Sequence, residues 1–272
     1  MNQEDPALSK VDVDRPSSAR IYDYFLGGAH NFEVDRRAAA DMVKTHPAAG
    51  LGMQANRSYL RRAVRYLCEQ GIDQFLDLGS GIPTVGNVHE IAQRANPDAR
   101  VVYVDVEPIA VTHSNTILTG NDKAIAIQAD MRNSDEVLSH SDTLRLLDLA
   151  RPVALIIAGV LQYIPDGDDP AAMIARYVAR MAPGSYVALS HPSTDGMSEE
   201  RRNGARTAST VYDRTATPFA YRSRAEFETF FAGLDLVEPG VTFMWSWRPE
   251  SETEAEGLGG RATGLAGVAR KP

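Results

Sequence analysis

The sequence predicts an α/β fold in which a mostly parallel sheet is covered by helices on both faces. Five short apolar segments typical of strands, at 73–80, 100–108, 124–131, 152–164 and 184–191, alternate with segments of helical periodicity. The fourth of them, PVALIIAGVLQYI, is too continuously apolar to have one face in water. Strands that are buried on both faces and separated by amphipathic helices indicate a parallel sheet between two helical layers.

The chain before the first strand differs in character from the rest. Residues 1–16 are charged, low in aromatic residues and without periodicity, so we expect a disordered tail. Residues 17–72 predict a helical cap of two short helices around Gly27-Gly28 and a longer third helix that ends near Gly71, with Asn56 and Arg57 at its start. We expect one domain over 17–272, with its Rossmann-like core at 73–272.

The last third of the chain adds a helix and two more strands. Four apolar residues share a stripe of helical spacing, Phe227, Phe230, Phe231 and Leu234. Two late strands are expected, VTFMWSWR at 241–248 and TGLAGVAR at 263–270, with an acidic, glycine-rich loop between them that we expect to be mobile.

Composition narrows the class of protein. With 272 residues, 43% of them hydrophobic, the chain is typical of globular proteins, and the net charge of −8 argues against a nucleic-acid partner. The single cysteine, Cys68, excludes an internal disulfide. Neither a signal peptide nor a membrane-length apolar run is present, so we expect a cytoplasmic protein without a membrane partner, as a monomer or homodimer.

A glycine turn follows the first strand, in FLDLGSGIPT. Gly79 and Gly81 permit positive φ angles and a close approach of the backbone to a ligand. A dinucleotide fingerprint requires a third glycine, where this chain has Pro83 and Thr84, so NAD is disfavoured. The Gly-Lys-Ser/Thr of a phosphate loop is also absent.

Acidic side chains end three successive strands, namely Asp77, Asp105 and Asp130. In a doubly wound sheet the ligand binds at this edge, where one carboxylate can accept ribose hydroxyls and another an adenine amino group. Carboxylates would repel a pyrophosphate, whereas they suit a cationic sulfonium. Strand-end aspartates also serve as helix caps, but three in succession predict S-adenosylmethionine (SAM) as the cofactor.

Several long blocks, among them SSARIYDYFLGGAHNFEVDR, NRSYLRRAVRYL and QFLDLGSGIPTVGNVHE, resemble a bacterial family of SAM-dependent methyltransferases formerly catalogued as a domain of unknown function. The resemblance implies the class I methyltransferase fold, with seven strands and an antiparallel last strand, and S-adenosyl-L-homocysteine (SAH) as the product. It also suggests that 22–30 cover the cofactor and that Arg57 pairs with its carboxylate, unless Arg57 is a solvated helix residue. The predicted cofactor residues are Asp77, Gly79, Ser80, Gly81, Asp105, Val106, Asp130, Met131, Arg57, Tyr22 and His30.

The catalytic apparatus is not evident from the sequence. Gln162 and Tyr163, after the fourth strand, can orient an acceptor or merely cap the strand. His191 ends the fifth strand as either a base or a structural histidine, and no metal-ligand spacing is present. Segment 193–223, rich in arginine and aromatic residues, is expected to wall the site of an acidic or aromatic small-molecule acceptor, or else to be a solvated helix and loop. A SAM-binding regulator without transfer activity is the alternative function.

Overall fold

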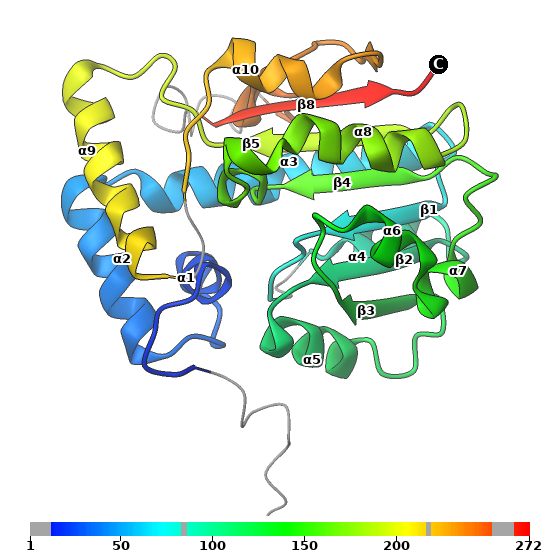
Figure 1. The fold of residues 1–272 in the computed structure, drawn as a ribbon, viewed down its shortest axis with the longest axis horizontal. Coiled ribbons are helices and arrows are strands. Elements are labelled where there is room, and N and C mark those ends of the chain that lie inside the picture. Colours follow the sequence, from blue (N-terminus) through cyan, green and yellow to red (C-terminus); the bar gives the residue numbers. More distant parts are fainter. Residues whose placement is uncertain (1–11, 83–85, 216–218, 252–263) are drawn as a thin grey trace, which may run out of the picture.

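Five parallel strands form the centre of the sheet in the computed structural model, which describes residues 12–82, 86–215, 219–251 and 264–272. These strands are β1 (Gln74–Leu78), β2 (Arg100–Asp105), β3 (Ala124–Gln128), β4 (Ala154–Ala158) and β5 (Tyr186–His191). The order across the sheet is β3-β2-β1-β4-β5-β8-β6 (Figure 1). Because the order reverses beside β1, the carboxyl ends of β1 and β4 open a crevice in which this class of sheet binds ligands.

The antiparallel edge differs from the sequence prediction. Strand β8 (Leu265–Arg270) runs antiparallel to β5, and both β6 (Asp235–Leu236) and β7 (Thr242–Phe243) pair with β8. The described residues therefore form eight strands rather than the implied seven, because Pro239 and Gly240 interrupt the outer strand and proline has no N–H to donate.

The strand predicted over 241–248 is too long. It ends at Phe243, after which the chain turns into the 3₁₀ helix η6 (Met244–Ser246). The buried Arg62 explains the turn, since its guanidinium donates to the carbonyl oxygens of Met244, at 2.6 Å, and Trp247, at 2.8 Å. Of the loop expected to be mobile, 252–260 lie outside the described residues.

Helices cover both faces of the sheet, as predicted. Alternate residues of β1 belong to different apolar clusters, with Leu76 and Leu78 in one and Phe75 in the other. The first cluster includes residues of α6 (Ser134–Ser139), α7 (Ser141–Leu146), α8 (Pro170–Arg180), α10 (Arg224–Glu228) and η5 (Thr229–Phe231). The second includes residues of α3 (Ala49–Glu69) and α4 (Val88–Ala95), and α5 (Pro108–Ile117) follows β2. Burial on both faces accounts for the continuous apolar strands.

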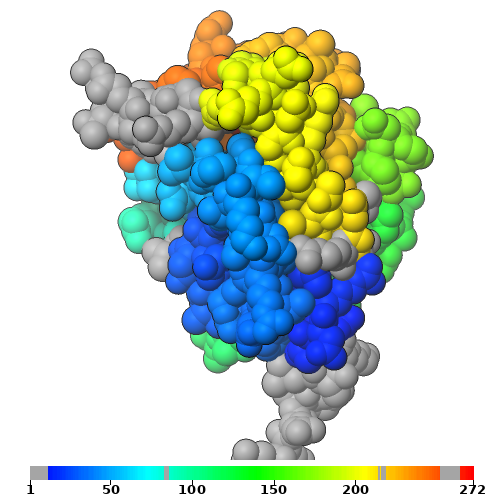
Figure 2. Space-filling model, turned by 90° about the vertical axis from the view of Figure 1, so that its left-hand side faces the viewer, coloured from blue at the N-terminus to red at the C-terminus, as the bar shows by residue number. Residues whose placement is uncertain are grey.

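A helical layer lies beyond the carboxyl ends of the parallel strands, where α1 (Ser18–Phe25), α2 (Glu33–Thr45) and α9 (Glu199–Ser209) gather (Figure 1). Figure 2 shows α2 and α9 side by side on this face. Apolar residues of α1, α2 and α9 and of η4 (Thr210–Arg214) form a cluster of their own. The helix α3 begins at Ala49, so the expectation that Asn56 and Arg57 start it is wrong; both lie well inside it.

The contact between α2 and α9 depends on a glycine. A Cβ atom on Gly204 would lie 2.3 Å from the carbonyl oxygen of Thr45. We expect Gly204→Ala to push the helices apart and lower the free energy of unfolding by about 1–3 kcal/mol, as overpacking does. Urea denaturation measures this, with Asn203→Ala at the adjacent exposed position as control. Equal stability of the two variants would contradict the close packing.

Candidate functional site

The main cavity, of about 280 Å³, lies at the carboxyl ends of β1, β2, β3 and β4 and beside α1. It contains every predicted cofactor residue except His30. The lining includes Tyr22, Arg57, Asp77, Gly79, Ser80, Gly81, Asp105, Val106, Asp130 and Met131. The carboxyl ends of three strands thus bring together residues up to 54 positions apart in the chain, from Asp77 to Met131.

The glycine turn supports this cavity in two ways. Gly79 and Gly81 have φ angles of 68° and 65°, in the region that other residues rarely adopt. A Cβ atom on Gly79 would lie 2.4 Å from Val160 Cγ2, whereas one on Gly81 would meet nothing within 4 Å. Gly79 therefore serves the packing of the turn on Val160, a reason different from the ligand approach that the sequence suggested.

Two carboxylates lie deep in the cavity. Burial raises the pKa of Asp77 to about 7, with Arg57 opposing the rise and Asp105 adding to it. Burial also raises the pKa of Asp105, although backbone N–H groups of Glu107 and Gly81 donate to its two oxygens at 2.9 and 2.7 Å. Asp105 is consequently held in one orientation by the turn.

Asp130 is less available than the sequence suggested. Its carboxylate accepts from the Arg132 Nε and backbone N–H, at 2.9 Å each, and these hydrogen bonds lower its pKa. Arg132 in turn reaches Asp168 at 3.0 Å. The lining also has apolar residues at the surface, since Val106 and Ile117 are 53% and 47% exposed.

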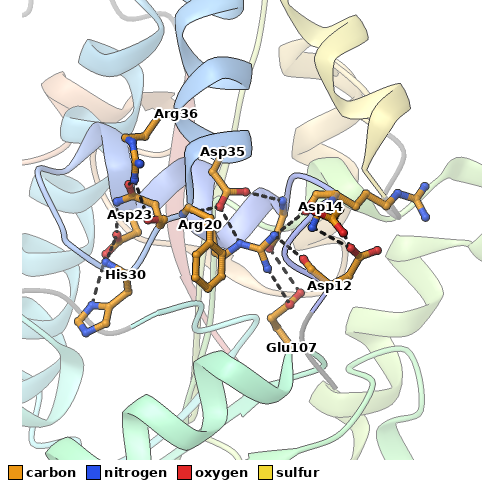
Figure 3. Close-up of polar contacts among 12 residues, drawn as sticks. Asp12, Asp14, Arg20, Asp23, His30, Asp35, Arg36 and Glu107 are labelled. Atoms are coloured by element: carbon orange, nitrogen blue, oxygen red, sulfur yellow. Dashed lines mark hydrogen bonds and ion pairs between the residues drawn. The ribbon is translucent and has the colours of Figure 1, made fainter. Parts of the chain in front are cut away.

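His30 does not line the cavity. It is exposed, its ring centroid is 4.2 Å from that of His113, and its N–H donates to Asp23 (Figure 3). Gly28 is needed for this turn rather than for a ligand, because a Cβ atom there would overlap the Asp23 carboxylate. The covering part of the cap is α1 itself, through Ser18, Ala19 and Tyr22.

A buried arginine fixes α1 over the cavity. Arg20 Nε donates to Asp35 of α2 at 2.8 Å, and Arg20 Nη1 lies 3.7 Å from Glu107, which lines the cavity (Figure 3). Arg20 and Asp35 are almost completely buried. The same guanidinium therefore contacts the cap and the cavity rim.

A second cavity, of about 110 Å³, adjoins the first. The two share four lining residues, Tyr22, Asn56, Gly159 and Tyr163, which we call the septum. Asn56 Nδ2 donates to the Tyr22 hydroxyl at 2.9 Å, and Ser190 Oγ donates to Asn56 Oδ1. Hydrogen bonds thus join two of the four septum residues, Tyr22 and Asn56, to each other and to β5.

The candidate catalytic residues divide between these places. Tyr163 belongs to the septum and Gln162 lines only the second cavity. His191 lines neither. It is completely buried, with Nδ1 bonded to the Pro192 carbonyl oxygen and Nε2 to Arg222. Burial is the main cause that lowers its pKa to about 3, so His191 is a neutral structural residue and not a base beside the cavities.

Segment 193–223 contributes aromatic rather than cationic groups to the second cavity. Tyr212, Phe219 and Tyr221 line it, whereas its lining includes none of the described arginines of the segment. Arg222 is instead buried, where it donates to Asp166 and to the carbonyl oxygens of Leu161 and Ile164. The expected wall therefore has its aromatic part only.

Sequence reasoning missed His46 and Glu107. His46 follows α2 and lines the second cavity, and burial and then Arg201 lower its pKa. No sequence signal identifies it, because the cavity is assembled from distant segments. Glu107, two residues after Asp105 in VDVEP, could have been predicted from the sequence, because it follows the end of the second strand just as Asp105 does.

Within 12–82, 86–215, 219–251 and 264–272, no group of three or more potential metal ligands is present. None of the helices in these ranges is long and apolar enough to cross a membrane.

Comparison with known proteins shows which family the chain belongs to. A family described as S-adenosyl methyltransferase matches residues 4–272. A DUF574 family protein from Streptomyces avermitilis is 38% identical with a TM-score of 0.90, over 96% of this chain and 99% of its own. A putative methyltransferase from Thermobifida fusca is also 38% identical, with a TM-score of 0.88, over 100% of this chain and 99% of its own.

Distant structures share the fold. Magnesium protoporphyrin IX methyltransferase from Synechocystis, solved with bound SAH, is 14% identical with a TM-score of 0.54, over 93% of each chain. This likeness confirms the predicted class I methyltransferase fold. No curated protein matches the chain.

The raised pKa of Asp77 predicts how stability depends on pH. A carboxylate whose pKa is higher folded than unfolded lowers stability as pH rises from about 4 to about 7, and the cost persists above. We expect Asp77→Asn to be more stable than the parent at pH 8, by on the order of 4 kcal/mol, and to lose that advantage near pH 4. Urea denaturation at both values measures this, with Asp122→Asn at an exposed position as control. If the stability difference between Asp77→Asn and the parent were the same at pH 8 and pH 4, the raised pKa of Asp77 would be contradicted.

Proposed function

Because the chain belongs to the S-adenosyl methyltransferase family, we propose that it transfers the methyl group of SAM to a small-molecule acceptor, with SAM bound in the main cavity. The observation that carries the proposal is the pair of adjoining cavities, one lined by carboxylates and one whose described lining has no charged side chain, which meet at the septum. A methyl donor and an acceptor require this arrangement, since their reacting atoms must come within contact of each other.

The nucleoside end of SAM is assigned to the β2 side of the cavity. Asp105 is oriented by two backbone N–H groups and retains acceptor capacity for ribose hydroxyls. The exposed Val106 and Ile117 and the buried Met131 provide apolar surface for the adenine ring. Asp130, already paired with Arg132, is the weaker candidate for the adenine amino group.

The amino-acid end is assigned to the β1 side. SAM carries a carboxylate and an ammonium group there, and the cavity offers Arg57 and Asp77. A guanidinium can bind a carboxylate through two parallel hydrogen bonds. Asp77, with its pKa near 7, ionises readily when a cation comes beside it, because an opposite charge favours the charged form.

When bound, SAM supplies a methyl group attached to a positively charged sulfur. A lone pair of the acceptor molecule forms the new bond to the methyl carbon, and the electron pair of the broken carbon–sulfur bond stays on the sulfur. The residues around it position the reactants and exclude water. Tyr22 is held by hydrogen bonds to Asn56 and to the Met53 carbonyl oxygen, and burial raises its pKa and that of Tyr163. Both hydroxyls therefore stay uncharged at neutral pH and form a fixed wall.

Calorimetric titration with SAM, SAH and NAD tests the cofactor assignment. We expect SAM and SAH to bind and NAD not to bind. Asp105→Ala should weaken SAM at least tenfold, about 1.4 kcal/mol, because ribose hydroxyls lose their acceptor.

Two variants sharpen this titration. Asp105→Asn keeps an acceptor oxygen and should bind SAM better than Asp105→Ala, while Asp122→Ala, at an exposed carboxylate outside the cavity, should match the parent. Unchanged affinity in Asp105→Ala would overturn the ribose assignment, and NAD binding in competition with SAM would overturn the cofactor site.

A further inference from the structure

We propose that the second cavity binds the methyl acceptor and that this acceptor is an uncharged, single-ring phenol. The inference rests on the proposed function and adds the chemical class of the substrate. It is drawn from the walls of the cavity, from its charge, from its size and from its contact with the SAM cavity.

Aromatic rings form one side of the cavity. Tyr212 and Phe219 are stacked with ring centroids 4.7 Å apart, and Tyr163 meets both at 5.4 and 5.9 Å. Tyr221 lies edge-on to Phe219 at 5.0 Å. The lining also includes the methionines Met42, Met53, Met197 and Met244. Flat faces and polarisable thioethers both favour an aromatic ring over a polar or extended molecule.

The lining carries no formal charge near neutral pH. Its described residues include no lysine, arginine, aspartate or glutamate. Burial raises the pKa of Tyr163 and of Tyr221 to about 12, and burial, together with Arg201, lowers that of His46. A charged acceptor would lose its hydration here without gaining a counter-charge, which is costly. The cavity therefore selects against carboxylates and ammonium groups.

The size sets the scale of the ligand. The volume of about 110 Å³ is somewhat below that of the apolar cavity of ~150 Å³ that holds benzene in an engineered protein. One aromatic ring, reaching toward the open side of the cavity, suits this space. A fused polycyclic acceptor does not fit within it.

Polar groups in the wall favour a hydroxyl on that ring. Gln162 is largely buried, its Nε2 donates to the Gly159 carbonyl oxygen at 2.6 Å, and its Oε1 has no partner among the described residues. That oxygen has almost no accessible surface, so the acceptor that the cavity offers to a ligand hydroxyl is the ring of His46. His46 can accept this O–H, since no described residue hydrogen bonds to its ring.

The septum sets the contact with the methyl donor. A Cβ atom on Gly159 would lie 2.6 Å from Asn56 Nδ2, so glycine keeps this part of the septum thin. In the transfer, the phenol oxygen lone pair bonds the methyl carbon and the carbon–sulfur bond breaks with its electron pair on sulfur. The O–H proton passes to His46, and the products are the methyl ether, SAH and protonated His46, which then releases the proton to water.

Binding to the SAH complex tests the acceptor class. Phenol, benzoate and benzylamine are matched single-ring probes that are neutral, anionic and cationic at pH 7.5. Ligand-observed NMR with the full chain and saturating SAH should show phenol at least tenfold tighter than either charged ring. Equal binding of the three, or binding of none, overturns the inference.

A cavity-filling variant locates the site. Gly52 lines the second cavity but not the first, and a Cβ atom there meets nothing within 4 Å. Gly52→Leu should abolish phenol binding and leave SAH affinity within twofold, whereas Gln54→Leu, exposed on the same helix, should change neither. Phenol binding that survives Gly52→Leu overturns the location. Failure of SAH to bind the parent overturns the proposed function, and this inference with it.

Turnover tests His46. With SAM and phenol, His46→Gln should lower kcat at least tenfold, leave phenol affinity within threefold and regain rate as pH rises, since phenolate needs no base. As a control, Lys44→Gln, at an exposed position in the last turn of α2, which His46 follows, should match the parent. A parent that makes no methyl ether, or a His46→Gln enzyme with unchanged kcat and pH profile, contradicts the proton step.

Discussion

The buried pair of Arg20 and Asp35 is the interaction on which the site depends (Figure 3). The guanidinium also donates to the carbonyl oxygens of Asp12 and Arg15 and lies 5.1 Å from the centroid of the Phe32 ring. Removing one partner of such a pair leaves an uncompensated buried charge, at about 3–5 kcal/mol. Since Arg20 also contacts Glu107, the stability of the cap and the shape of the cofactor rim are coupled.

The position of α1 decides how the two cavities meet. Tyr22 is two residues from Arg20 on the same helix and joins the septum through Asn56, whose amide oxygen accepts from Ser190 at the end of β5. The partition thus connects the cap, the long helix and the sheet by hydrogen bonds between fixed side chains. A displacement of α1 would move Tyr22 and alter both cavities together, so the shapes of the two cavities are coupled.

The sequence predicted the features that depend on neighbouring residues. Continuous apolar strands, the glycine turn and the strand-end acids predicted the sheet and the cavity because burial and switch-point geometry depend on sequence position. The division of the edge strand into β6 and β7 was not predicted, because it depends on the interruption at Pro239. The early end of β7 was not predicted either, because it depends on Arg62, which is distant in the chain. His191 is paired with Arg222, and His46 faces a cavity built from six or more segments, so neither role is visible in neighbouring residues.

The two cavities differ in charge. The carboxylates of Asp77, Asp105, Glu107 and Asp130 all line the main cavity, and the described lining of the second cavity has none. Methyl transfer to a neutral acceptor moves positive charge away from sulfur. In a low-dielectric chamber that charge is poorly tolerated on the acceptor, so its proton must leave as the bond forms. A chamber whose described lining has no fixed charge suits a neutral base, and its described residues include the imidazole of His46, whose pKa burial and Arg201 lower, so that the ring is unprotonated at neutral pH and can accept a proton.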